Sequence, residues 1–272
     1  MNSHSQSTSE SNPTPPDELP FVAPCRQLDA LAPLRWLELG WRDLRRAPGP
    51  SLSYGVAVLA ISYGISAIAW HYGSVYLLLA MLSGFIFIGP VMAVGLYSIS
   101  RQLQAGRQPV LGYCLREGRR HLGNLLVFAV ILLVVFLVWA RAASMVHVFF
   151  PMDADPELTD FALFLGVGTA VGTLFAAVIF CASAFSLPML LDRRADTVTA
   201  VLTSINAVLR NKPAMLFWAA LIVAIVLAGF ATGLLGLALG MPVVGHATWH
   251  AYQETIDASA WPRNDAAIQE NT

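Results

Sequence analysis

Residues 122–146 read LGNLLVFAVILLVVFLVWARAASMV, an almost unbroken apolar run in which Arg141 is the one charged side chain. A helix that crosses a membrane needs about 20 predominantly apolar residues, because the hydrocarbon core is about 30 Å thick. This run is long enough to cross, and a soluble domain would have to bury all of it. The run therefore predicts a transmembrane helix.

The composition of the whole chain agrees with a membrane location. Of its 272 residues, 56% are hydrophobic and 12% are charged, whereas soluble domains carry about 25% charged residues. The net charge is −1, and no basic segment stands apart as a nucleic-acid-binding domain would. These values exclude an ordinary soluble enzyme, a disordered protein and a nucleic-acid-binding protein. The sequence predicts an all-α, polytopic transmembrane helical bundle.

Four further apolar runs are candidate spans: Ser51–Tyr72, Ser74–Ile99, Phe161–Leu191 and Ala214–Tyr252. The last one would make a helix about 58 Å long, nearly twice the thickness of the hydrocarbon core. It either forms one helix with a stripe of small residues, which gives five spans, or folds back near Gly229–Gly233, which gives six.

Internal similarity favours six spans. Leu37–Pro48 and Leu202–Pro213 share two leucines, an arginine and the final proline, and Gly112–Leu122 is a looser third copy. Each copy reads as a basic amphipathic segment before a pair of spans. Each pair also has a proline in its returning helix; these are Pro90, Pro188 and Pro242. We therefore predict three hairpins, each led by a cytoplasmic amphipathic segment, with five spans as the alternative.

Charge asymmetry gives the orientation. Arginines crowd residues 35–46, 101–120 and 193–210, whereas residues 147–160 contain four acidic residues and no Lys or Arg. Arg-rich loops stay in the cytoplasm, so the N-terminus is predicted to be cytoplasmic. Leu28–Leu44 is predicted to be an amphipathic helix in the membrane plane, with Leu34, Leu37, Trp41 and Leu44 facing inward.

The two ends of the chain are polar. Residues 1–27 are expected to be a disordered tail, residues 28–258 a single transmembrane domain and residues 259–272 a flexible tail. The first 20 residues lack the apolar region of a signal peptide, so the first span is expected to direct insertion. The three cysteines form no CxxC pair and predict neither a disulfide framework nor a zinc site.

Few residues could carry chemistry. His246 and His250 are four apart, with Trp249 beside them, so both rings face one side of a helix and are the weak candidates for a haem or metal. Arg141 is expected to anchor at the outer headgroups or to contact an anion. Pro90, Pro188 and Pro242 could kink their helices for packing or break them at a transport site. Since no known catalytic motif is present, we expect no enzyme activity, no metal and no cofactor.

Several stretches resemble a bacterial integral-membrane family, domain-of-unknown-function family 2189. They are Ile88–Tyr97, Asp192–Asp196, Arg210–Ile222 and, most specifically, Gly245-His-Ala-Thr-Trp-His-Ala-Tyr252. The resemblance covers about residues 28–258. It implies a multi-pass protein of the bacterial inner membrane, and some members carry a cytochrome c oxidase label. A haem–copper subunit needs histidines on several helices, whereas His246 and His250 form the one pair here.

Three functional hypotheses follow. The first is a non-enzymatic scaffold or assembly factor that acts through membrane lipids or a membrane-protein partner. The second is a small-solute or lipid transporter with broken helices around a cavity. The third is a haem- or metal-binding respiratory accessory protein. The near absence of ionisable residues within the spans argues against an ion-coupled pump.

Overall fold

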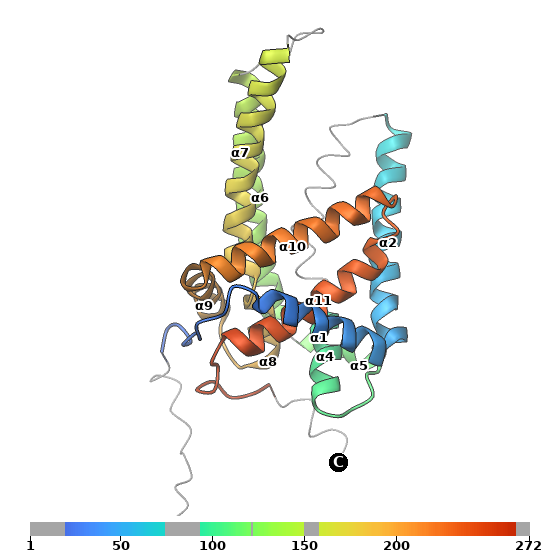
Figure 1. Ribbon diagram of the computed structural model, residues 1–272, viewed down its shortest axis with the longest axis vertical. Helices are drawn as coiled ribbons and strands as arrows, with labels where there is room; N and C mark the ends of the chain where they lie inside the picture. Colours follow the sequence, from blue (N-terminus) through green and yellow to red (C-terminus); the bar gives the residue numbers. More distant parts are fainter. Residues whose placement is uncertain (1–19, 74–92, 121, 150–157, 265–272) are drawn as a thin grey trace, which may run out of the picture.

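The computed structural model describes residues 20–73, 93–120, 122–149 and 158–264, and these residues form helices joined by short connections. The predicted all-α class is confirmed for this part of the chain. The helices, labelled as in Figure 1, are α1 (Ala32–Arg46), α2 (Pro48–His71), α4 (Val94–Gln104), α5 (Leu111–Arg120), α6 (Leu122–Phe149), α7 (Leu158–Ser183), α8 (Ser186–Asp192), α9 (Thr197–Arg210), α10 (Lys212–Ala231) and α11 (Leu237–Thr255).

Four helical stretches among the described residues are long and apolar enough to cross a membrane. They are Pro48–His71, Leu122–Val146, Leu158–Asp192 and Lys212–Ala231. Each coincides with a predicted run, so a membrane protein with several spans is confirmed. The predicted span Ser74–Ile99, with Pro90, lies mostly outside the described residues, and only its end appears in α4.

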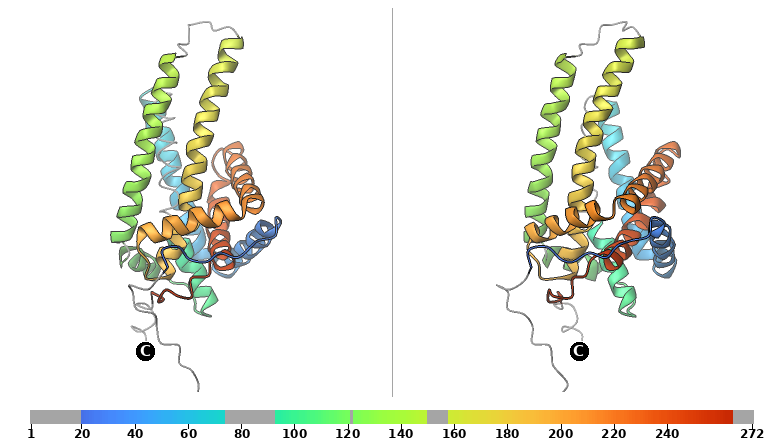
Figure 2. Two further views of the ribbon diagram at one scale, coloured as in Figure 1. Left: turned by 90° about the vertical axis from the view of Figure 1, so that its left-hand side faces the viewer. Right: turned by 60° about the vertical axis from the view of Figure 1, so that its left-hand side comes forward.

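Helices α6 and α7 stand side by side and extend away from the other described helices (Figures 1 and 2). Much of their surface consists of exposed apolar side chains, as expected of helices surrounded by lipid. Those of α6 include Leu126, Val127, Val130, Leu133, Val134, Leu137 and Val138.

The third candidate span bends where α7 ends and α8 begins. Pro188 has no N–H with which to bond the carbonyl of Ala184, so the helical ladder is interrupted there. The backbone N–H of Phe185 donates instead to the Ser204 hydroxyl of α9, at 3.1 Å, and that hydroxyl donates to the carbonyl of Cys181 at 2.7 Å. Helix α8, which contains Pro188, is entirely buried.

The C-terminal apolar run folds back on itself. The chain reverses between α10 and α11, where Gly233 and Leu234 have φ angles of 63° and 73°. Glycine adopts such angles without strain. The single long helix of the five-span alternative is therefore wrong, and the fold-back is confirmed a few residues later than predicted.

The tip of this hairpin lies against the middle of α2. The hydroxyl of Tyr63 donates to the carbonyl of Gly233 at 2.7 Å. Tyr63 is 15 residues after Pro48, or about 22 Å along a helix whose 24 residues measure about 36 Å. The hairpin thus ends well before the far end of α2, and α11 is not one of the four candidate spans.

Helix α11 runs back from this tip through the centre of the described bundle, packed against α1, α2, α4 and α10. It remains helical through Pro242, so of the two alternatives for this proline the structure shows packing within a continuous helix. Pro242 nevertheless frees the carbonyl of Ala238 from its usual helical partner. A side chain at Gly55 of α2 would overlap this carbonyl, so the two helices approach closely because residue 55 is glycine.

Helix α1 begins at Ala32, four residues after the predicted start, and crosses α11 through Trp36, Gly40 and Asp43. Leu44 is buried within the protein, whereas Leu34 and Trp41 of the predicted inward set are exposed. The apolar residues of α1 therefore lie on two surfaces. Leu44 packs against the protein, and Leu34 and Trp41 are exposed.

Both ends of the described chain pack beyond the predicted domain boundaries. Ala23 is buried, and its N–H donates to Thr203 at 3.0 Å, while Arg26 N–H donates to the carbonyl of Thr255 at 2.8 Å. Trp261 is buried, and the N–H of Asn264 donates to the carbonyl of Asp192 at 2.9 Å. Residues on both sides of the predicted range 28–258 therefore contact the helices.

Candidate functional site

The polar side chains of α11 form one buried cluster with partners from four other helices. The sequence places them in Gly245-His-Ala-Thr-Trp-His-Ala-Tyr252, and the partners come from α1, α2, α4 and α8. We call these α11 side chains and their partners the α11 polar cluster. It is the candidate functional site.

His246 lies between two serines. Its Nε2 is 2.9 Å from the hydroxyl of Ser51 in α2, and its Nδ1 is 2.7 Å from the hydroxyl of Ser100 in α4. A neutral imidazole has one donor and one acceptor nitrogen, so one serine accepts from the ring and the other donates to it. Burial disfavours the charged form and lowers the pKa of His246 to about 4, despite the opposing effect of Asp43. His246 therefore links α2 and α4 as a neutral ring.

His250 and Trp249 share Gln104 of α4. The Trp249 indole N–H donates to Gln104 Oε1 at 2.9 Å, and Gln104 Nε2 lies 3.4 Å from His250 Nδ1. With this amide orientation Gln104 donates to Nδ1, so Nε2 carries the ring proton and donates to Asp43 Oδ2 of α1, at 2.8 Å. Both nitrogens of His250 are thus engaged by α1 and α4.

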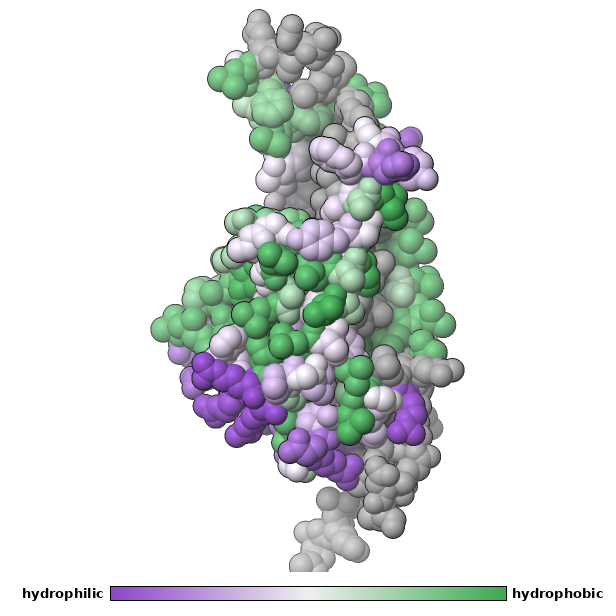
Figure 3. Space-filling model, turned by 90° about the vertical axis from the view of Figure 1, so that its right-hand side faces the viewer, coloured by the Kyte–Doolittle hydropathy of each residue, from purple (hydrophilic) through white to green (hydrophobic). Residues whose placement is uncertain are grey.

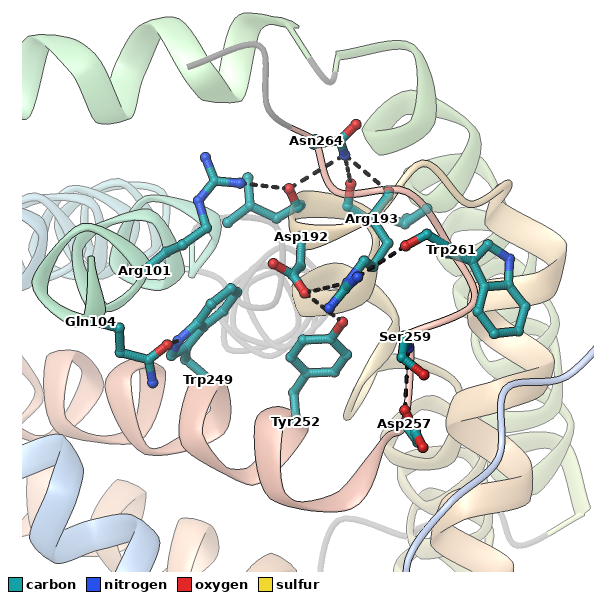
Figure 4. Close-up of polar contacts among 12 residues, drawn as sticks. Arg101, Gln104, Asp192, Arg193, Trp249, Tyr252, Asp257, Ser259, Trp261 and Asn264 are labelled. Atoms are coloured by element: carbon teal, nitrogen blue, oxygen red, sulfur yellow. Dashed lines mark hydrogen bonds and ion pairs between the residues drawn. The ribbon is translucent and has the colours of Figure 1, made fainter. Parts of the chain in front are cut away.

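Tyr252 and Asp192 form another part of the cluster (Figure 4). The Tyr252 hydroxyl donates to Asp192 Oδ2 at 3.0 Å, and Arg193 Nε donates to the same oxygen at 2.8 Å. Burial and the neighbouring Asp192 carboxylate raise the pKa of Tyr252 well above its usual value, so its hydroxyl stays a donor. Arg193 also donates to the carbonyl of Trp261 at 2.9 Å, which joins the C-terminal segment to the cluster.

Two further contacts extend the cluster to the end of α11. Glu254 accepts a hydrogen bond from the Trp36 indole at 2.8 Å and forms an ion pair with Arg35, both residues of α1. Trp36 packs edge-on against Trp218 of α10, with ring centroids 5.7 Å apart. Helices α1, α10 and α11 are thereby held together at one place.

The arrangement does not gather metal ligands. His246 and His250 lie on the same helix as predicted, but their ring nitrogens face different partners. Within the described ranges no group of three His, Cys, Asp or Glu side chains could hold a metal ion, and every deeply buried side-chain nitrogen or oxygen there has a hydrogen-bond partner.

The other sequence candidates lie apart from the cluster. Arg141 is exposed on α6, Pro188 is in buried α8, and Pro242 is buried between α11 and α2. Pro90 lies outside the described residues. Trp249 is the one candidate besides the histidines that belongs to the cluster.

Sequence reasoning missed most of the partners. Ser51 and Ser100 carried no signal, because single serines near helix ends are common. Asp43 and Asp192 did give a signal in the sequence. Asp43 lies among arginines and Asp192 directly before two arginines, within a chain that has few charged residues. Their burial marks them as structural partners of α11.

Comparison with known proteins identifies one family. Residues 77–192 match the profile of a family described as "Predicted integral membrane protein (DUF2189)". The resemblance to this family is confirmed. The match covers less than half of the chain and includes α4 to α8, whereas the α11 motif lies outside it. No curated protein and no solved structure matches the chain.

Proposed function

We propose that this protein is a non-enzymatic scaffold or accessory protein of a bacterial inner membrane. The observation that carries the proposal is the use of the α11 motif: its two histidines, its tryptophan and its tyrosine all bind other helices of the same chain. Side chains engaged in this way hold a rigid structure and are unavailable to a substrate. Function then depends on the outer surfaces that this structure presents to lipids and to a membrane-protein partner.

We propose that the α11 polar cluster lies on the cytoplasmic side, with the N-terminus. The cluster is at the end of α2 that begins at Pro48, directly after Arg45 and Arg46, and arginines mark cytoplasmic ends. The α10–α11 hairpin enters from this side and returns to it, which supports a cytoplasmic C-terminal segment. In this arrangement the third predicted hairpin is re-entrant and does not add two full crossings.

The transporter alternative has less support. A transport site needs open space at the helix breaks. Near Pro188 the backbone N–H of Phe185 is bound by Ser204, and at Pro242 the helix is continuous and packs against Gly55. The respiratory accessory alternative needs His246 or His250 as a ligand, and both rings are already bound on both nitrogens. We therefore rank the scaffold first, the transporter second and the haem- or metal-binding protein third.

The test uses photo-crosslinking in the native membrane. A photoreactive amino acid at Leu137 of α6 or Leu174 of α7, both exposed, should give a discrete adduct with one protein. The same amino acid at Leu209, exposed at the end of α9, is the control for the opposite end of the molecule. The purified protein should show no haem absorbance and no stoichiometric metal. A haem band that disappears in His250→Asn would overturn the proposal, as would uptake of a solute by protein reconstituted in vesicles.

A further inference from the structure

One face of α1 is exposed, and it carries both apolar and basic side chains. We call it the α1 outer face; it consists of Leu31, directly before the helix, and of Leu34, Trp41, Arg42, Arg45 and Arg46, all exposed, together with the exposed Glu38, whose carboxylate pairs with Arg42 at 3.1 Å. Successive helical residues are 100° apart, so Leu34 and Trp41 form one strip, and Arg42, Arg45 and Arg46 form an adjacent strip that also contains Glu38. The opposite side of α1 is buried against α11 and α10.

The position of α1 fixes the depth of this face. Only Ala47 separates α1 from α2, and α2 is a candidate span from its first residue, Pro48. The arginines at the end of α1 therefore lie where a spanning helix enters the membrane, at the level of the lipid headgroups. Figure 2 shows α1 at the edge of the molecule, on the side away from α6 and α7, where lipid can reach it.

The chemistry of the face matches an anionic lipid. Trp41 has an amphipathic ring suited to the membrane interface, and the Arg45 guanidinium lies 5.1 Å from its ring centroid. Arginine forks pair with phosphate oxygens in a bidentate geometry. Exposed leucines beside them fit the first methylenes of acyl chains. Figure 3, which views the molecule from the right-hand side of Figure 1, shows most of the strongly hydrophilic residues in the lower part, below a mainly hydrophobic surface.

We propose that the α1 outer face binds the headgroups of anionic phospholipids, with Arg42, Arg45 and Arg46 on the phosphate and Leu34 and Trp41 on the acyl region. An acidic segment of a partner protein would satisfy the arginines but would leave the apolar strip uncovered. Free phosphate would use the arginines alone. A lipid satisfies both strips at once, and the inference does not depend on the scaffold proposal.

The experiment measures lipid binding to the full-length protein in detergent by native mass spectrometry. Phosphatidylglycerol and phosphatidylcholine, which share acyl chains, are titrated separately. The wild type should retain phosphatidylglycerol more tightly. The triple variant R42Q/R45Q/R46Q should lose at least about tenfold in that affinity, because each arginine near an anionic surface contributes about fivefold. The control R116Q/R194Q/R263Q removes three exposed arginines on other elements and should bind as the wild type does.

Two further arms separate the possible ligands. L34S/W41S should weaken phosphatidylglycerol binding, which free phosphate would not explain, and inorganic phosphate at a matched concentration should not displace the lipid. The proposal is overturned if the control loses as much affinity as the triple variant, if L34S/W41S has no effect, or if phosphate competes fully. Thermal unfolding identical to the wild type excludes misfolding of the variants.

Discussion

At the scale of single residues, His246 is fully enclosed, and both of its serine partners are fully buried as well. Its ring exchanges hydrogen bonds on both sides, so removing or charging it affects α2, α4 and α11 together. An uncharged histidine at this position is stable because two hydroxyls replace the water it gave up. A proton would add a charge that neither serine can neutralise.

This makes His246 sensitive to acid. Its pKa is about 4 in the folded protein, below its usual 6.5, so the unfolded chain binds a proton as the pH falls below 6.5 while the folded one does not. The stability that neutral His246 contributes is therefore present above pH 6.5 and is lost towards pH 4. His246→Asn cannot be protonated, so the melting temperature in detergent should fall by about 5 °C less than that of the wild type over this range.

The control for this measurement is His71→Asn, an exposed histidine at the end of α2. It should lose stability with acid as the wild type does. An equal loss in His246→Asn and the wild type would show that other groups account for the whole acid response.

The sequence predicted the relative position of the two histidines but not their hydrogen-bond partners. The spacing of His246 and His250 placed both on one helix, because that relation is local. Their partners Ser51 and Asp43 are 195 and 207 positions away, and nothing in one sequence pairs residues at such distances. Two histidines on one helix whose hydrogen-bond partners are unknown resemble free metal ligands, and the metal hypothesis rested on this resemblance.

At the scale of helices, the closest approach is that of α2 to α11. Gly55 makes room for the carbonyl that Pro242 leaves without a helical partner. A backbone carbonyl cannot rotate away as a flexible side chain can. The glycine on one helix and the proline on the other therefore act as a matched pair.

Gly55→Ala should separate these two helices. Its methyl group would overlap the carbonyl of Ala238, and overpacking of this kind costs about 1–3 kcal/mol. The measurement is the free energy of unfolding in mixed micelles. Gly64→Ala, in the same helix but with open space around it, is the matched control and should be neutral or slightly stabilising. Equal effects of the two changes would contradict the close-contact argument.

Helix positions were predicted better than helix breaks. Apolar length and glycine spacing located α2, α6, α7 and the reversal after α10, because these depend on local composition. Pro242 left two alternatives open because a proline in a packed helix can keep its helix intact when a neighbour accommodates the freed carbonyl. The sequence contains the proline but does not reveal its neighbour.

At the scale of the whole molecule, the composition was enough to predict a helical membrane protein. It was not enough to predict which helices contact lipid and which contact protein. Lipid and protein interior are both apolar, so the apolar side chains of α6, which are largely exposed, and those of α8, which are buried, give the same kind of sequence signal. Helix α11 is the clearest case: its apolar first half reads as a span, yet it packs within the protein next to α2. The contact between Tyr63 and Gly233, which supports the proposed re-entrant hairpin, is not visible in the sequence.

Orientation and the depth of the hairpin can be tested together with single cysteines. In a background with Cys25, Cys114 and Cys181 replaced by serine, one cysteine is placed at Arg116, at Leu158 or at Leu235, all exposed. The predicted external site Asp155 lies outside the described residues, and Leu158 at the start of α7 stands in for it. A membrane-impermeant maleimide added to intact cells should label position 158 and not position 116, because arginine-rich segments stay in the cytoplasm.

Position 235 separates a re-entrant hairpin from two full crossings. With its tip about 22 Å along α2, the hairpin ends inside the hydrocarbon core, so a cysteine there should resist the reagent from outside, where a full crossing would expose it. Permeabilised cells provide the control, since position 116 should then react. Labelling of position 116 in intact cells would show that the orientation is opposite to the predicted one. Labelling of position 235 from outside would restore six full crossings, and the contact of Tyr63 with the turn would then lie near the outer surface.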